Sequence, residues 1–111
     1  MFLGIAIPLK AKSVSKSWDI TCDSLEASIS AIINQSESDY VVVIAGHDCP
    51  EFINENNVDN IIFHRVDFPE PKKDNNIFSA QALIEDKILK IITALNILKK
   101  YHPDYVFQLD S

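Results

Sequence analysis

Hydrophobic residues follow one another without interruption in three parts of the chain. Continuous apolar runs of this kind are typical of parallel strands that are buried on both faces. They predict buried strands over Met1–Ile7, over Tyr40–Gly46 and in the segment YVFQLDS from Tyr105 to Ser111. The segment Asn60–Val66 also has strand-forming residues, but its polar positions place it nearer an edge of the sheet.

Two segments between these strands repeat apolar residues at helical spacing. The first predicts a helix that opens at a capping box of Asp23 and Glu26 and ends near Asn34–Gln35. The second predicts the longest helix of the chain, over Ala80–Tyr101. The positions expected to face the core are Leu25, Ile29, Ile32 and Ile33 in the first helix, and Ile84, Ile88, Ile91, Leu95 and Leu98 in the second.

The remaining segments are connections between these elements. A short helix is expected within Cys49–Asn57, and Asp67–Ser79 has the length and composition of a loop that serves a function. Strands therefore alternate with helices along the whole chain. This order predicts an α/β fold of Rossmann-like type, with a parallel sheet of about four strands and helices on both faces.

Composition and charge limit the class of protein and its partners. The 111 residues suit a single domain, and the 47% of apolar residues indicate a globular protein. The net charge of −6 argues against nucleic acid and anionic membranes as partners, because both attract basic surfaces. The apolar N-terminus is too short to span a bilayer, so we expect no transmembrane segment and a location in the cytoplasm or at the cytosolic face of a membrane.

Candidate chemistry lies in the loops that follow the predicted strands, since ligands of open parallel sheets bind at the carboxyl ends of the strands. The chain has only two glycines, so neither a dinucleotide-binding fingerprint nor a P-loop can form. For His47, which lies in one of these loops, a structural role is favoured over a ligand contact. Cys22 and Cys49 lack the spacing of metal ligands and are interpreted as inert thiols. The loops in question are Leu9–Lys12, Gly46–Asp48, the segment from Asp67 onward, and Asp110–Ser111.

Asp110 follows the last predicted strand, and two interpretations of it remain open. A carboxylate at this place could contact a ribose, or a divalent metal ion that bridges to phosphate groups. An Asp-Ser pair after a strand is also typical of the N-cap of a following helix. Position alone does not separate a ligand contact from a helix cap.

Four short motifs occur in order along almost the whole chain. They are the first strand with its proline-containing turn, GIAIPLKAK, the helix end AIINQS, the strand and turn VVVIAGHD, and the closing YVFQLDS. Together they resemble the nucleotide-binding half of GT-A glycosyltransferases of family 2, in which the helix end is written SILNQ. The resemblance implies the strand order 3-2-1-4 and the transfer of a sugar from a nucleoside diphosphate donor, such as a UDP- or GDP-sugar, to an acceptor.

The resemblance also implies which residues bind the donor. In the family, the last of these strands runs into an Asp-x-Asp element that holds the ribose and a divalent cation. Asp110 matches the first acid and Ser111 the spacer, so we expect the chain to be a fragment that ends inside this element. Asp110 is then a metal ligand, with Mg²⁺ or Mn²⁺ expected in the complete enzyme. The positions implied to contact the nucleotide sugar are Pro8, Leu9, Lys10, Asp48, Lys87 and Asp110.

The chain departs from the family after the second strand, where an Ala-Gly pair replaces the paired acids that contact the base. Asp48 lies two residues further on and is the substitute that we expect if the turn is wider. Lys87, next to Asp86, matches a basic residue facing the diphosphate, whose charge an ammonium would offset. The alternative is a surface helix in which Asp86 and Lys90 form a weak i,i+4 pair.

Two functions remain open at this point. The first is the N-terminal, nucleotide-sugar-binding part of a metal-dependent glycosyltransferase. Lacking the second acid, an acceptor subsite and a catalytic base, this part is expected to be inactive alone. The second is a stand-alone Rossmann-like binding module that engages a partner protein without catalysis. An open sheet edge beside the last strand would also allow self-association.

Overall fold

A computed structural model describes residues 1–35, 39–55 and 60–110 of the chain. Its centre is a parallel sheet of four strands in the order β3-β2-β1-β4. The predicted α/β class and the strand order 3-2-1-4 are therefore confirmed. The strands are β1 (Phe2–Pro8), β2 (Asp39–Gly46), β3 (Ile61–Arg65) and β4 (Tyr105–Gln108).

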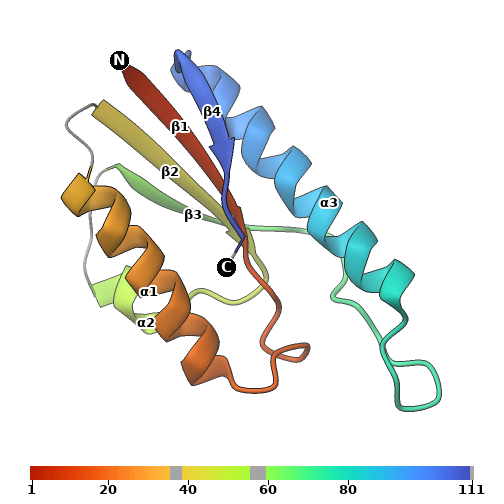
Figure 1. Cartoon of the computed structure of the whole chain (residues 1–111). Coiled ribbons are helices and arrows are strands. Elements are labelled where there is room, and N and C mark those ends of the chain that lie inside the picture. Colours follow the sequence, from red (N-terminus) through yellow and green to blue (C-terminus); the bar gives the residue numbers. More distant parts are fainter. Residues whose placement is uncertain (36–38, 56–59, 111) are drawn as a thin grey trace.

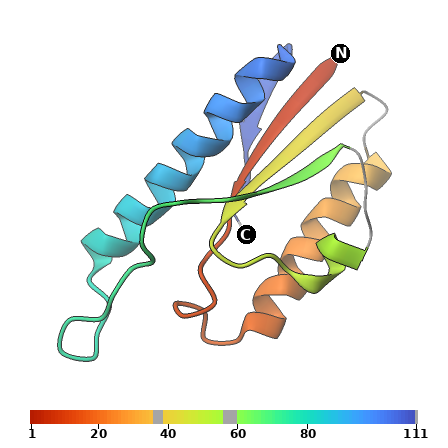
Figure 2. The ribbon, with the colours of Figure 1, turned by 180° about the vertical axis from the view of Figure 1, so that it is seen from behind.

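Helices cover both faces of the sheet, as predicted. Helix α1 (Trp18–Gln35) and the short α2 (Glu51–Glu55) lie on one face, and the long α3 (Ala80–Leu98) lies on the other (Figure 1). The view from behind shows α3 crossing the sheet obliquely on the opposite side from α1 (Figure 2). A turn of 3-10 helix, η1 (Lys99–Tyr101), continues α3.

Successive residues of the central strands point to opposite faces, which divides the core into two layers. Ile5 and Ile7 of β1 belong to the layer under α1, whereas Ala6 between them belongs to the layer under α3. Burial on both faces explains why these strands are continuously apolar. The first layer consists of Ile5, Ile7, Leu9, Leu25, Ile29, Val42 and Ile44, and the second of Ala6, Val41, Val43, Ala45, Val66, Ala94 and Leu98.

Helix α1 begins five residues earlier than the capping box at Asp23 predicted, so that prediction is wrong. The hydroxyl of Ser17 accepts a hydrogen bond from the Ile20 N–H at 3.3 Å, which satisfies one of the first amides of the helix. Trp18, the first helical residue, packs against the core layer under α1. The aromatic anchor and the serine cap together set the start of α1.

Strand β4 is not buried, contrary to the prediction from its apolar sequence. Tyr105, Val106 and Phe107 are 57%, 45% and 50% exposed. The reason is its position: β4 pairs with β1 on one side and forms the edge of the sheet, and α3 packs over β1 and β2. An apolar run cannot show by itself whether neighbouring elements cover the strand.

The predicted core stripe of α3 is only partly correct. Ile84 and Ile88 are 57% and 49% exposed, and the fully buried positions of the helix are Lys90, Ala94 and Leu98. Figure 1 shows that the first turns of α3 extend past the carboxyl ends of the strands, where no sheet lies beneath them. The helix begins as predicted, since the Ser79 hydroxyl accepts a hydrogen bond from the Ala82 N–H at 3.0 Å.

The other connections agree with the sequence. The short helix α2 falls within the expected Cys49–Asn57, whose end at Asn57 lies outside the described residues. The loop Asp67–Ser79 contains a single bridge between Asp74 and Ile77 and no other regular structure. Within the described ranges, no helix combines the length and the apolarity that crossing a bilayer requires.

Candidate functional site

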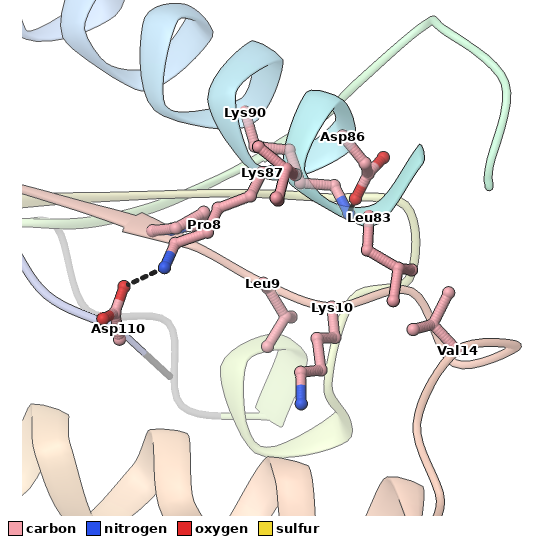
Figure 3. Close-up of a pocket in the computed structure, with 10 residues that line it drawn as sticks. Pro8, Leu9, Lys10, Val14, Leu83, Asp86, Lys87, Lys90 and Asp110 are labelled. Atoms are coloured by element: carbon pink, nitrogen blue, oxygen red, sulfur yellow. Dashed lines mark hydrogen bonds and ion pairs between the residues drawn. The ribbon is translucent and has the colours of Figure 1, made fainter. Parts of the chain in front are cut away.

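A pocket lies at the carboxyl ends of β1 and β4, beneath the first turns of α3 (Figure 3). The chain runs from β1 to β2 on one side of β1 and places β4 on the other side, so the strand order reverses at this point. Open parallel sheets bind their ligands at such a reversal. The pocket has a volume of about 230 Å³ and is lined by Pro8, Leu9, Lys10, Val14, Leu83, Ile84, Asp86, Lys87, Lys90 and Asp110.

The structure brings together five of the six residues that the sequence marked as nucleotide-binding. They come from three separate parts of the chain, namely the end of β1, the first half of α3 and the tip of β4 (Figure 3). Asp48 is the exception, because its carboxylate Oδ2 accepts a hydrogen bond from the Lys12 N–H at 2.7 Å. Asp48 therefore shapes the loop after β1 here, and its contact with a base stays a prediction. The five residues that line the pocket are Pro8, Leu9, Lys10, Lys87 and Asp110.

The floor of the pocket is fixed by the end of β1. Pro8 pairs with Ala45 of β2, and the Leu9 N–H donates a hydrogen bond to the Ala45 carbonyl oxygen at 2.9 Å. The Leu9 side chain is fully buried in the core layer under α1, whereas Lys10 is exposed. The backbone after β1 thus continues the sheet for one residue and then presents Lys10 to the pocket.

Asp110 reaches the pocket from the tip of β4. The Leu109 N–H donates to the Ala6 carbonyl oxygen at 3.0 Å, which continues the pairing with β1 beyond the strand itself. Asp110 Oδ1 then lies 2.8 Å from Lys87 Nζ and accepts a hydrogen bond from Gln108 Nε2 at 2.7 Å. These contacts, above all the one with Lys87, lower the pKa of the Asp110 carboxyl from its ordinary value. Ser111, the expected spacer, lies outside the described residues.

Lys90 is a residue of the site that sequence reasoning treated as one half of a surface pair. The pair with Asp86 does form, with Nζ 2.6 Å from Oδ2, but the side chains are only 1% and 12% exposed. The surface interpretation is therefore wrong, and the ammonium of Lys90 is buried at the wall of the pocket. Asp86 Oδ1 is also buried and makes no hydrogen bond to the described residues. The i,i+4 spacing was the available signal for the pair, and it carries no information on burial.

The lining of the pocket is positively charged within an acidic chain. The lining contains three lysines, Lys10, Lys87 and Lys90, and two acids, Asp86 and Asp110, so it carries one net positive charge. The whole chain carries −6. Lys10 makes no ion pair with any other described residue. A local excess of positive charge of this kind favours an anionic ligand.

The described residues contain no cluster of side chains that could hold a metal ion without further ligand atoms. No group of three or more His, Cys, Asp or Glu side chains comes together in the described ranges. Of the two carboxylates in the lining, Asp110 is 69% exposed and Asp86 is 12% exposed. Mg²⁺ is commonly bound through one or two carboxylates together with substrate phosphates. Asp110 fits that arrangement, provided that the other ligand atoms come from a phosphorylated ligand.

A second, larger hollow adjoins the pocket and enlarges the space for a ligand. It shares Lys10, Val14 and Leu83 with the pocket and extends over the start of α1 to Phe78, with a volume of about 640 Å³. Ligand sites for small molecules usually measure roughly 300–1,000 Å³. The pocket alone is below that range, and the pocket with the hollow reaches it.

His47 and the two cysteines do not line the pocket. His47 Nε2 lies 3.0 Å from the Phe68 carbonyl oxygen, and the two rings meet edge to face at 5.4 Å, so His47 ties the β3–α3 loop to the end of β2. Cys22 and Cys49 form no disulfide, and burial raises the pKa of both thiols. Protonated thiols are poor nucleophiles, which agrees with the interpretation of inert cysteines.

Comparisons of the chain with models of known families, with curated proteins and with solved structures found no match.

Proposed function

We propose that this chain is the nucleotide-sugar-binding part of a metal-dependent glycosyltransferase, and that the pocket beneath α3 binds the donor. The observation that carries the proposal is the meeting of Lys10, Lys87 and Asp110 at the reversal of strand order. These residues are far apart in sequence, and each comes from an element that the resemblance to GT-A glycosyltransferases assigns to the donor site. The positive lining suits a diphosphate.

Each side chain has a defined task in this proposal. Lys87 and Lys10 donate hydrogen bonds to phosphate oxygens, and the fully buried Leu9 anchors the start of the loop after β1 so that the nucleoside lies over Pro8 and Lys10. The Asp110 carboxylate is one ligand of a divalent cation such as Mg²⁺ or Mn²⁺. When bound, that cation neutralises charge on the diphosphate and makes it a better leaving group.

Titration with UDP and with GDP, each with and without Mn²⁺, tests the proposal. Amide resonances of Leu9–Lys12, Lys87 and Asp110 are expected to shift, with a larger response when Mn²⁺ is present. Lys87→Met is expected to weaken binding roughly tenfold or more, because a hydrogen bond between charged groups contributes about 1.5–3 kcal/mol. Lys100→Met removes the same charge from η1, beyond the far end of α3, and is the control. Unchanged spectra at millimolar concentrations of both nucleotides, with Mn²⁺, would refute the proposal.

A second candidate function, association through β4, is favoured by the exposure of that strand. Its outer edge pairs with no other described strand, and three consecutive apolar side chains are exposed on it. An edge of this kind is a template for pairing with another chain. We expect sedimentation to show a fraction of dimer that rises with protein concentration, and we expect Val106→Lys to abolish the dimer. A monomer at every concentration would exclude this candidate.

A further inference from the structure

The ion pair between Lys87 and Asp110 closes one side of the pocket. The Lys87 side chain leaves α3, passes over Pro8 and meets the carboxylate at the tip of β4 (Figure 3). The pair adds a direct contact between α3 and β4, whereas β4 pairs with β1 and the main packing of α3 is on β1 and β2. It therefore bounds the pocket on the side of β4.

We propose that this ion pair is a latch that the ligand opens, so that nucleotide binding and metal binding assist one another. The inference rests on the proposed function and concerns the regulation of the same site. While the pair is formed, the Lys87 ammonium contacts the Asp110 carboxylate, which also accepts a hydrogen bond from Gln108. A diphosphate that takes Lys87 releases the carboxylate for a cation, and a cation that takes Asp110 releases the ammonium for the diphosphate.

The other ammonium groups of the lining cannot replace Lys87 in this role. Lys90 is buried against Asp86 at 2.6 Å, and opening that pair would leave a charge without a partner in the core. Lys10 makes no ion pair with the described residues, so it is available to an anion from the start. Lys87 is thus the one cation of the lining that changes partner at little cost.

The exposure of the latch explains why a ligand can open it. The two side chains are 50% and 69% exposed, and exposed ion pairs contribute about 0–1 kcal/mol. A diphosphate offers Lys87 more negative charge than a single carboxylate does. By linkage, a cation that competes for Asp110 must raise the affinity for the nucleotide by the same factor as the nucleotide raises the affinity for the cation.

Replacement of Asp110 with asparagine tests the latch in the 111-residue chain. Without metal, Asp110→Asn is expected to bind UDP or GDP roughly two- to fivefold more tightly than the unmodified chain, because Lys87 is already released. With Mn²⁺, the same variant is expected to lose the gain in affinity that the metal gives the unmodified chain. Isothermal titration calorimetry at low ionic strength measures both effects.

Two controls separate the latch from a general effect of charge. Glu85→Gln removes one negative charge from an exposed position on α3 that does not line the pocket, and it should leave the metal-free affinity unchanged. In a chain that already carries Lys87→Met, Asp110→Asn should give no further gain. Equal gains from Asp110→Asn and Glu85→Gln, or a gain that persists without Lys87, would overturn the latch while nucleotide binding stands. Failure of every chain to bind either nucleotide with Mn²⁺ would overturn both proposals.

Discussion

Asp86→Asn is expected to lower the free energy of unfolding by about 3 kcal/mol, because breaking a buried ion pair leaves an uncompensated charge. Lys90 is 1% exposed, and Asp86 Oδ2 at 2.6 Å is its counterion. Asparagine keeps the shape of the side chain and an acceptor oxygen but removes the negative charge. Urea unfolding followed by circular dichroism measures the loss.

The same pair offers its own controls. Asp86→Asn combined with Lys90→Met removes both charges and should recover most of the lost stability, because an apolar side chain can fill the space of the buried lysine. Glu85→Gln changes a neighbouring exposed carboxylate and should alter the free energy of unfolding by less than about 0.5 kcal/mol. If Asp86→Asn were no more destabilising than Glu85→Gln, the ammonium of Lys90 would have to reach water.

Leu98→Ala is expected to destabilise the chain by about 2–5 kcal/mol, the usual cost of removing a large side chain from a packed core. Leu98 is fully buried in the layer under α3 and lies close to the backbone of β1 at Gly4. Leu89→Ala, on the same helix but 46% exposed, should cost less than about 1 kcal/mol. Thermal and urea unfolding of the two variants give the comparison.

Gly4 provides a second test of how Leu98 packs against β1. A Cβ at Gly4 would lie 3.2 Å from Leu98 Cδ2 and 3.1 Å from Pro103 Cγ, so Gly4→Ala alone meets tight contacts. In the Leu98→Ala background, the first of these contacts is gone and the new methyl group fills part of the space. The contacts with Pro103 remain, so the double variant should be destabilised by less than the sum of the two single changes. Additive destabilisation by the two changes would show that Leu98 does not pack on Gly4.

The sequence predicts the fold of this chain more fully than it predicts which surfaces are buried. The alternation of strands and helices, with strands apolar on both faces, was sufficient for the α/β class. The exposure of β4 could not be predicted, since its apolar sequence, including Tyr105 and Phe107, is also typical of a central strand. Their exposure depends on which elements lie beside β4, and this is a property of the assembled sheet.

The candidate site was predictable where it depends on the ends of strands. Pro8, Leu9 and Asp110 follow apolar runs directly, so the rule that ligands bind at the carboxyl ends of parallel strands places them together. Lys90 could not be found in this way, because the isoleucines of α3 suggested a different buried face. Its burial results from the oblique packing of α3 across β1 and β2.

The floor of the pocket at Leu9 and its wall at Asp110 differ in local stability. The floor at Leu9 is hydrogen-bonded to β2 and fully buried, so it opens only when the core opens. The wall at Asp110 follows an exposed edge strand and is tied to α3 by one exposed ion pair, so it can open locally. A ligand therefore meets one side that sets its position and one side that adjusts to its size. For the donor site that we propose, this predicts that donors with different sugars share a single nucleotide-binding floor.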